Sequence, residues 1–81
     1  MRLDKYLKVS RIIKRRTVAN EACDAGRVLI NDKVAKAGTE VRIGDVIKVQ
    51  FGTAPIMVRV TGLEENPRKE DASSLYEILH D

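Results

Sequence analysis

The segment of residues 2–16 carries the densest set of functional side chains in the chain. It reads RLDKYLKVSRIIKRR and sets seven cations against one acid, Asp4. The cations are Arg2, Lys5, Lys8, Arg11, Lys14, Arg15 and Arg16. Guanidinium and ammonium groups at this density bind phosphate oxygens through charge-assisted hydrogen bonds. The segment therefore predicts a surface for a structured polyanion, and RNA fits it best.

Residues for catalysis or metal binding are not grouped anywhere in the sequence. There is no glycine-rich cofactor loop, no metal-spaced set of His and Cys, and no paired acid with a nucleophile. Cys23 has neither a His base nor a second Cys and is interpreted as a packing residue. His80 is too isolated to suggest chemistry. We expect no enzyme activity, no metal and no cofactor.

Charge is distributed unevenly along the 81 residues. The net charge is +3, but residues 1–36 carry +6 and residues 37–81 carry −3. A molecule with one electropositive end can be oriented by a phosphate backbone. With only three aromatic residues in the chain, stacking platforms for single-stranded bases are scarce.

Length and cysteine usage limit the organisation and the compartment. Eighty-one residues are enough for one domain with a thin core. A lone cysteine cannot form an internal disulfide, and no apolar run approaches the roughly 20 residues of a membrane span. We also expect no signal peptide before Met1. We expect a reduced, cytoplasmic location and a monomer.

The first ten residues predict a short helix. Its apolar residues recur at helical spacing on one side, while Asp4, Lys5 and Lys8 point elsewhere. Two roles are open for Asp4. As a first-turn carboxylate it would interact with the helix dipole. Alternatively, it would orient a neighbouring arginine such as Arg11 or Arg16.

Residues 11–16, RIIKRR, predict the joint between this helix and a second one. Ile12 and Ile13 would enter the core, whereas the four cations would stay exposed beside helix amides that also attract anions. Phosphate contact is therefore favoured over a merely solvated face. The second helix is expected to have Thr17 as its N-cap and Gly26 as its left-handed stop. Its predicted apolar stripe is Val18, Ala22 and Ala25, with Ala19 and Cys23 alongside.

Beyond Gly26 the pattern is typical of strands. The predicted strand segments are residues 27–30, 34–36, 45–51 and 56–60, with a shorter run at 40–43. Residues 31–33 and Gly44-Asp45 provide turns. Arg27 and Lys33 are expected at the same basic end as the helices, with Lys36 as a further candidate there. Phe51 and Met57 are expected in the core.

The C-terminal segment has Ala72, Leu75, Ile78 and Leu79 at helical spacing. Residues 71–80 therefore predict a short amphipathic helix. The predicted fold class is α+β, with two short N-terminal helices packed on a small, mainly antiparallel sheet and a short helix at the C-terminus.

These motifs, in this order, resemble the S4-type RNA-binding domain, also called the alpha-L motif. The resemblance covers roughly residues 1–51. It comprises RLDKYL, the arginine cluster, the hairpin entrance A-G-R-V-x-I-N and the G-D turn before a valine-rich strand. It implies an RNA-binding domain over residues 1–66, followed by a tail over residues 67–81.

Within this superfamily the chain is similar to the RqcP family, small stand-alone proteins of bacterial ribosome-associated quality control. The chain length, the start MRLDKYLKVSRIIKRRT and the late L-Y-E-I-L segment carry this similarity. It implies binding to rRNA and peptidyl-tRNA on obstructed large ribosomal subunits, in support of alanine tailing with the NFACT-family protein RqcH. The alternatives are recycling of such subunits, as in the fifteen-kilodalton heat-shock family, or a general structural RNA-binding or protein-interaction module.

The basic segment and the resemblance together assign residues to RNA binding. These are Arg2, Lys5, Lys8, Arg11, Lys14, Arg15, Arg16, Arg27 and Lys33. Arg2 and Arg16 are the first candidates, and Asp4 is retained as a motif residue whose role stays open.

Overall fold

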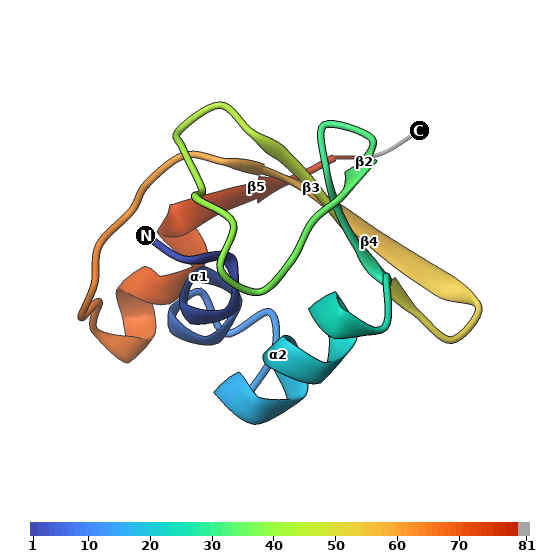
Figure 1. Ribbon diagram of the computed structural model, residues 1–81. Coiled ribbons are helices and arrows are strands. Elements are labelled where there is room, and N and C mark those ends of the chain that lie inside the picture. The colour runs from blue at the N-terminus through green and yellow to red at the C-terminus, as the bar shows by residue number, and fades with distance from the viewer. Residues whose placement is uncertain (80–81) are drawn as a thin grey trace.

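The computed structural model describes residues 1–79, except for the side chain of Phe51. Its helices are α1 (Leu3–Val9), α2 (Arg16–Asp24) and the 3-10 helix η1 (Lys69–Leu75) (Figure 1). Its strands are β1 (Val28–Ile30), β2 (Lys33–Val34), β3 (Val46–Phe51), β4 (Ala54–Val60) and β5 (Tyr76–Ile78). They form one antiparallel sheet in the order β2-β1-β3-β4-β5. The predicted α+β class is confirmed, whereas the predictions for His80 and for the Phe51 side chain concern parts outside this description.

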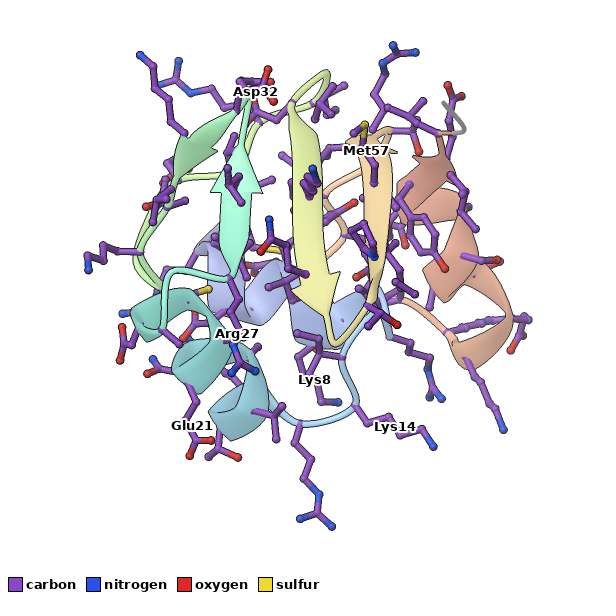
Figure 2. The ribbon with its side chains drawn as sticks, turned by 90° about the vertical axis from the view of Figure 1, so that its right-hand side faces the viewer. Lys8, Lys14, Glu21, Arg27, Asp32 and Met57 are labelled. Carbon is purple, nitrogen blue, oxygen red and sulfur yellow. The ribbon has the colours of Figure 1, made fainter. Side chains whose placement is uncertain are left out.

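The core lies between α1, α2 and one face of the sheet. Alternate strand residues such as Ile47, Val49, Val58 and Val60 are at most 1% exposed, as a half-buried sheet requires. The opposite face of the sheet is open and faces the viewer in Figure 2. Met57 lies on that open face and is half-buried, so its predicted place in the core was wrong. Successive residues of a strand point to opposite faces of the sheet, and in β4 it is the next residue, Val58, that points into the core.

The loop after β2 accepts hydrogen bonds from the first turn of α1. The amides of Leu3 and Asp4 donate to the carbonyls of Thr39 and Ala37 at 2.8 and 3.1 Å. The run predicted as a strand at 40–43 forms only a single bridge, between Arg2 and Glu40. These first-turn amides of α1 are therefore bound within the protein and do not face an anion.

Helix α2 begins earlier and is rotated relative to the sequence prediction. Arg15 occupies the N-cap position without a side-chain capping bond, so the prediction of Thr17 as N-cap was wrong. Gly26 follows the helix at a φ of +75°, the left-handed stop that was predicted. The buried residues are Ala19 and Cys23, and burial raises the pKa of the Cys23 thiol to about 11. Of the predicted stripe, Val18 and Ala25 are exposed, whereas Ala22 is partly buried against the core.

The C-terminal segment contains a shorter helix than expected, followed by a strand. Helix η1 buries Ala72 and Leu75, which are three residues apart and so face the same side of a 3-10 turn. Residues 76–78 then pair with β4 as β5, which corrects the helix predicted to residue 80. Without β5, the edge of β4 would have unpaired backbone groups, and a sequence pattern does not reveal this free edge. The Tyr6 hydroxyl donates to the Leu75 carbonyl at 2.7 Å and joins α1 to this segment.

In the part of the chain that the structure describes, no helix has the length and apolar character that a bilayer crossing requires.

Candidate nucleic-acid interface

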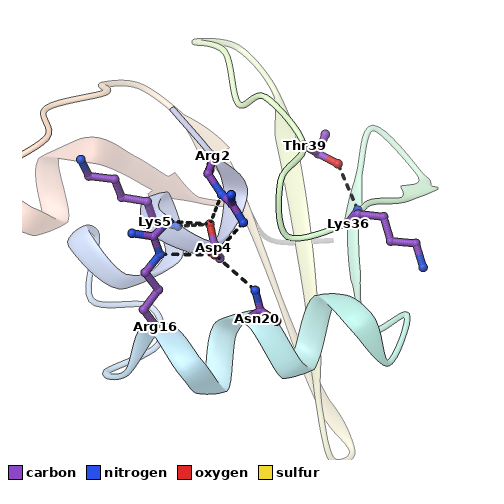
Figure 3. A network of polar contacts seen from close by, with 7 residues as sticks. All are labelled: Arg2, Asp4, Lys5, Arg16, Asn20, Lys36 and Thr39. Carbon is purple, nitrogen blue, oxygen red and sulfur yellow. Dashed lines mark hydrogen bonds and ion pairs between the residues drawn. The ribbon is translucent and has the colours of Figure 1, made fainter.

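Asp4 is the centre of a polar network between α1 and α2 (Figure 3). Its carboxylate accepts hydrogen bonds from Arg2 Nε and Nη2 at 3.1 and 3.3 Å, and from Arg16 Nε and Nη2 at 3.3 and 3.4 Å. The Lys5 amide and the Asn20 side-chain amide donate to it at 2.8 and 3.4 Å. Asp4 was expected to point away from the buried side of its helix, and that was wrong. It fills both roles that the sequence left open, since it binds a first-turn amide and orients Arg16.

The network sets a buried acid beneath two exposed cations. The Asp4 side chain is 3% exposed, whereas Arg2 and Arg16 are 54% and 49% exposed. Burial alone would raise the pKa of Asp4, but the hydrogen bonds from Arg16 and Arg2 outweigh it and hold that pKa below its usual value of 3.8. Asp4 therefore stays ionised and holds both guanidinium groups at the surface.

The ion pairs of Asp4 predict a specific pH dependence of stability. Because its folded pKa is lowered, its contribution is fully present above pH 3.8 and is lost as the pH falls through the folded value. Comparing the protein with Asp4→Asn, we expect a difference of about 1–3 kcal/mol in the free energy of unfolding at neutral pH. Denaturant unfolding at a series of pH values should show this difference shrinking only below pH 3.8. A difference independent of pH would contradict the ionised pair.

The joint between α1 and α2 keeps its cations in solvent, as predicted. Ile13 is 5% exposed, whereas the side chains of Arg11, Lys14 and Arg15 are exposed. Arg11 adopts a φ of +64°, a left-handed conformation that turns the chain from one helix to the next. Within residues 1–79, no acid pairs with these three cations. Their charge is free to meet a phosphate.

Three further lysines differ in availability. Lys5 Nζ lies 3.3 Å from Glu65 Oε1, so part of its charge is balanced within the protein. Lys8 is exposed on α1, and it has no ion-pair partner in the described part of the chain. Lys36 donates its backbone amide to Thr39 at 3.0 Å, and its side chain points away from Asp4 in Figure 3. Lys8 is therefore the better candidate for a phosphate contact.

Arg27 and Lys33 do not lie at the same end, which corrects the prediction. Arg27 precedes β1, whereas Lys33 pairs with Ile30 at the other end of that strand. In Figure 2, Arg27 is at the helix end with Lys8 and Lys14, and Asp32, the neighbour of Lys33, is at the opposite end. Asn31 and Asp32, at φ of +51° and +69°, form the tight turn that returns the chain as β2. The hairpin therefore carries Lys33 away from the basic segment.

The site contains one polar residue that was not selected from the sequence. Asn20 donates to Asp4, and it follows Arg16 by one helical turn, so both side chains face α1 from the same side of α2. That spacing was readable, but nothing in the sequence placed Asp4 opposite α2. A hollow of about 360 Å³ is lined by Asp4, Arg16, Thr17, Asn20 and Glu21.

Among residues 1–79, no group of three or more His, Cys, Asp or Glu is arranged to hold a metal ion.

Comparison with known proteins identifies similar sequences and folds. The model of the S4 domain matches residues 1–47. An RQC P-site tRNA stabilizing factor from Halalkalibacterium halodurans is 55% identical over 78 residues, covering 96% of this chain and 89% of that protein. One from Streptococcus pneumoniae is 49% identical over 79 residues, covering 98% and 90%. The trimeric structure of heat shock protein 15 from Vibrio cholerae is 29% identical, with a TM-score of 0.90 over 98% of this chain and 81% of that one.

Proposed function

This chain belongs to the S4 domain family, within its group of RQC P-site tRNA stabilizing factors, and on that premise we propose a non-enzymatic clamp for tRNA and rRNA. This proposal rests on the pair of exposed guanidinium groups that Asp4 holds between α1 and α2. A guanidinium group has five N–H donors, and each arginine uses two of them on Asp4. The remaining donors of these half-exposed side chains have no hydrogen-bond partner among residues 1–79 and are available to phosphate oxygens.

The clamp recognises RNA by shape and backbone. Side chains cannot read bases in the deep, narrow major groove of A-form RNA, whereas fixed guanidinium groups fit phosphate oxygens in a bidentate manner. The cations around the pair add attraction without setting its geometry. They are Lys5, Lys8, Arg11, Lys14, Arg15 and Arg27, and Lys33 would reach only RNA that extends to the far end of β1.

The finer proposal places this clamp on an obstructed large ribosomal subunit in the cytoplasm. As a monomer beside the partner RqcH, it would hold peptidyl-tRNA in one position while alanine residues are added to the stalled chain. Peptide transfer belongs to the ribosome, and this protein contributes positioning only. The name of the related factors, which refers to stabilising tRNA in the P site, supports this assignment. We also propose residues 1–66 as the RNA-binding domain and residues 67–81 as its tail.

Sedimentation of the tagged protein from lysate on a sucrose gradient, with sequencing of the bound RNA, tests this proposal. We expect the protein with free large subunits that carry tRNA, and loss of alanine tails when the gene is deleted. A protein that stays at the top of the gradient at low salt would refute the RNA clamp.

A recycling role of the heat-shock type is the second candidate, favoured by the structural match to heat shock protein 15. The two candidates differ in one readout. If the deletion strain accumulates obstructed large subunits whose nascent chains still carry alanine tails, the recycling role holds and the tailing role fails.

The RNA clamp predicts a strong dependence of affinity on salt. Neutralising about five or six phosphates gives a slope of roughly −4 in a plot of log affinity against log salt concentration. Fluorescence anisotropy with a labelled RNA hairpin over a range of potassium chloride concentrations measures this slope. A slope near zero would favour a protein-interaction module whose basic face serves solubility.

A further inference from the structure

Val18 and Ala25 of α2 are exposed and line an open groove together with Ala22, which is partly buried against the core. Val18, in the first turn of the second helix, is 43% exposed. The groove measures about 350 Å³, and its lining residues are Val18, Glu21, Ala22, Ala25, Arg27 and Gln50. The floor is aliphatic, and the rim carries a carboxylate, a guanidinium group and a side-chain amide. Nothing in the described part of the chain fills this groove.

The groove is held open by the backbone on its strand side. The Gln50 amide donates to the Arg27 carbonyl at 2.9 Å, which fixes the end of β3 against the entrance to β1. A smaller hollow of about 210 Å³, lined by Arg27, Gln50 and Gly52, continues toward the turn between β3 and β4. Arg27 and Gln50 border both hollows, so the groove leads from α2 to the tip of this hairpin.

The charge around the groove is that of the RNA-binding face. Arg27 lies at the same end of the molecule as Lys8 and Lys14 (Figure 2), and these three have no ion-pair partner among residues 1–79. An RNA backbone that follows these cations passes the mouth of the groove. Apolar side chains and guanidinium planes are surfaces on which unstacked bases lie, and acids and amides accept or donate at base edges.

The size and lining of the groove match a nucleotide better than a protein. Its volume is at the lower end of small-ligand sites, which begin at about 300 Å³. A protein partner would need a larger patch with aromatic or arginine anchors and the pockets that receive them. Here the floor is made of two alanines and one valine, which suit the flat face of a base.

We propose that the groove between α2 and the tip of the β3–β4 hairpin binds one unpaired nucleotide of the bound RNA. The base lies on Val18 and Ala22, with its phosphate near Arg27 and its edge facing Glu21 or Gln50. This inference rests on the proposed RNA clamp, and it adds recognition of a bulged or looped nucleotide to the backbone contacts at Arg2 and Arg16.

Two RNA probes test this proposal: a fully paired hairpin and the same hairpin with a single bulged nucleotide, compared by fluorescence anisotropy. We expect the protein to bind the bulged hairpin at least about fivefold more tightly, because the face of the base and the aliphatic floor of the groove are both removed from water. Val18→Ser and Arg27→Gln should remove most of this preference. Ile43→Ser is the matched control, since Ile43 is 66% exposed in the loop before β3, at the opposite end of that strand from Gln50.

The outcomes distinguish the nucleotide site from the RNA clamp on which it rests. Equal binding of both hairpins by the unaltered protein, or an unchanged preference in Val18→Ser, would overturn the nucleotide site and leave the clamp intact. Failure to bind either hairpin at low salt would overturn the clamp itself. An equal loss of preference in Ile43→Ser would show that the effect is not specific to the groove, and the nucleotide site would be overturned.

Discussion

Arg16→Ala should weaken binding to RNA and to the large subunit by about 1–3 kcal/mol, or roughly 5- to 150-fold in the dissociation constant. The side chain is half exposed and held in place by Asp4, so its free donors meet phosphate with little further ordering. Arg2→Ala should have an effect of similar size, because Arg2 makes the equivalent pair on the same carboxylate. Anisotropy with an RNA hairpin and co-sedimentation with large subunits measure the two effects.

The control for both variants is Arg59→Ala. Arg59 is also half exposed and also pairs with an acid, Glu77, but it lies on the open side of the sheet. The substitution removes the same charge, and an exposed pair contributes at most about 1 kcal/mol to stability. Thermal unfolding must show that all three variants remain folded. If Arg59→Ala weakens binding as much as Arg16→Ala, net charge and not the fixed pair explains affinity.

Local patterns in the sequence predicted most of the elements. Alternation located β3 and β4, and Gly26 marked the end of α2, because these features depend on neighbours along the chain. Strand β5 was missed since its residues also fit a helical period, and only the free edge of β4 decides between the two. The same limit applies to α2, whose two possible apolar faces differ by a rotation that packing against α1 sets.

The candidate site, like the fold, could be predicted from the sequence only in part. The number and spacing of cations predicted a basic surface, and the exposed joint confirms it. The burial of Asp4 and its contact with Asn20 depend on how α1 and α2 meet, which no local spacing encodes. Lys33 was misplaced for a related reason, because the length of β1 and the tight turn after it determine which end of the sheet a hairpin residue reaches.

Asp4→Asn provides a test in which charge and geometry predict opposite signs. The substitution raises the net charge from +3 to +4, so simple attraction to phosphate predicts tighter binding. The geometric argument predicts weaker binding. Without the carboxylate, Arg2 and Arg16 become mobile, and ordering each long side chain on binding costs about 0.5–1.5 kcal/mol. Together these costs amount to roughly 5- to 150-fold in the dissociation constant, more than one exposed charge contributes.

The measurement compares the dissociation constant and its salt slope for the protein, Asp4→Asn and Glu65→Gln. Glu65→Gln is the matched control, since it also removes one acid that pairs with a cation, Lys5, but leaves the arginine pair in place. We expect tighter or equal binding for Glu65→Gln and weaker binding for Asp4→Asn, although both carry the same net charge. Because the number of cations is unchanged, the salt slope should stay near that of the parent while the affinity falls. Tighter binding by a folded Asp4→Asn protein would show that the clamp depends on charge alone.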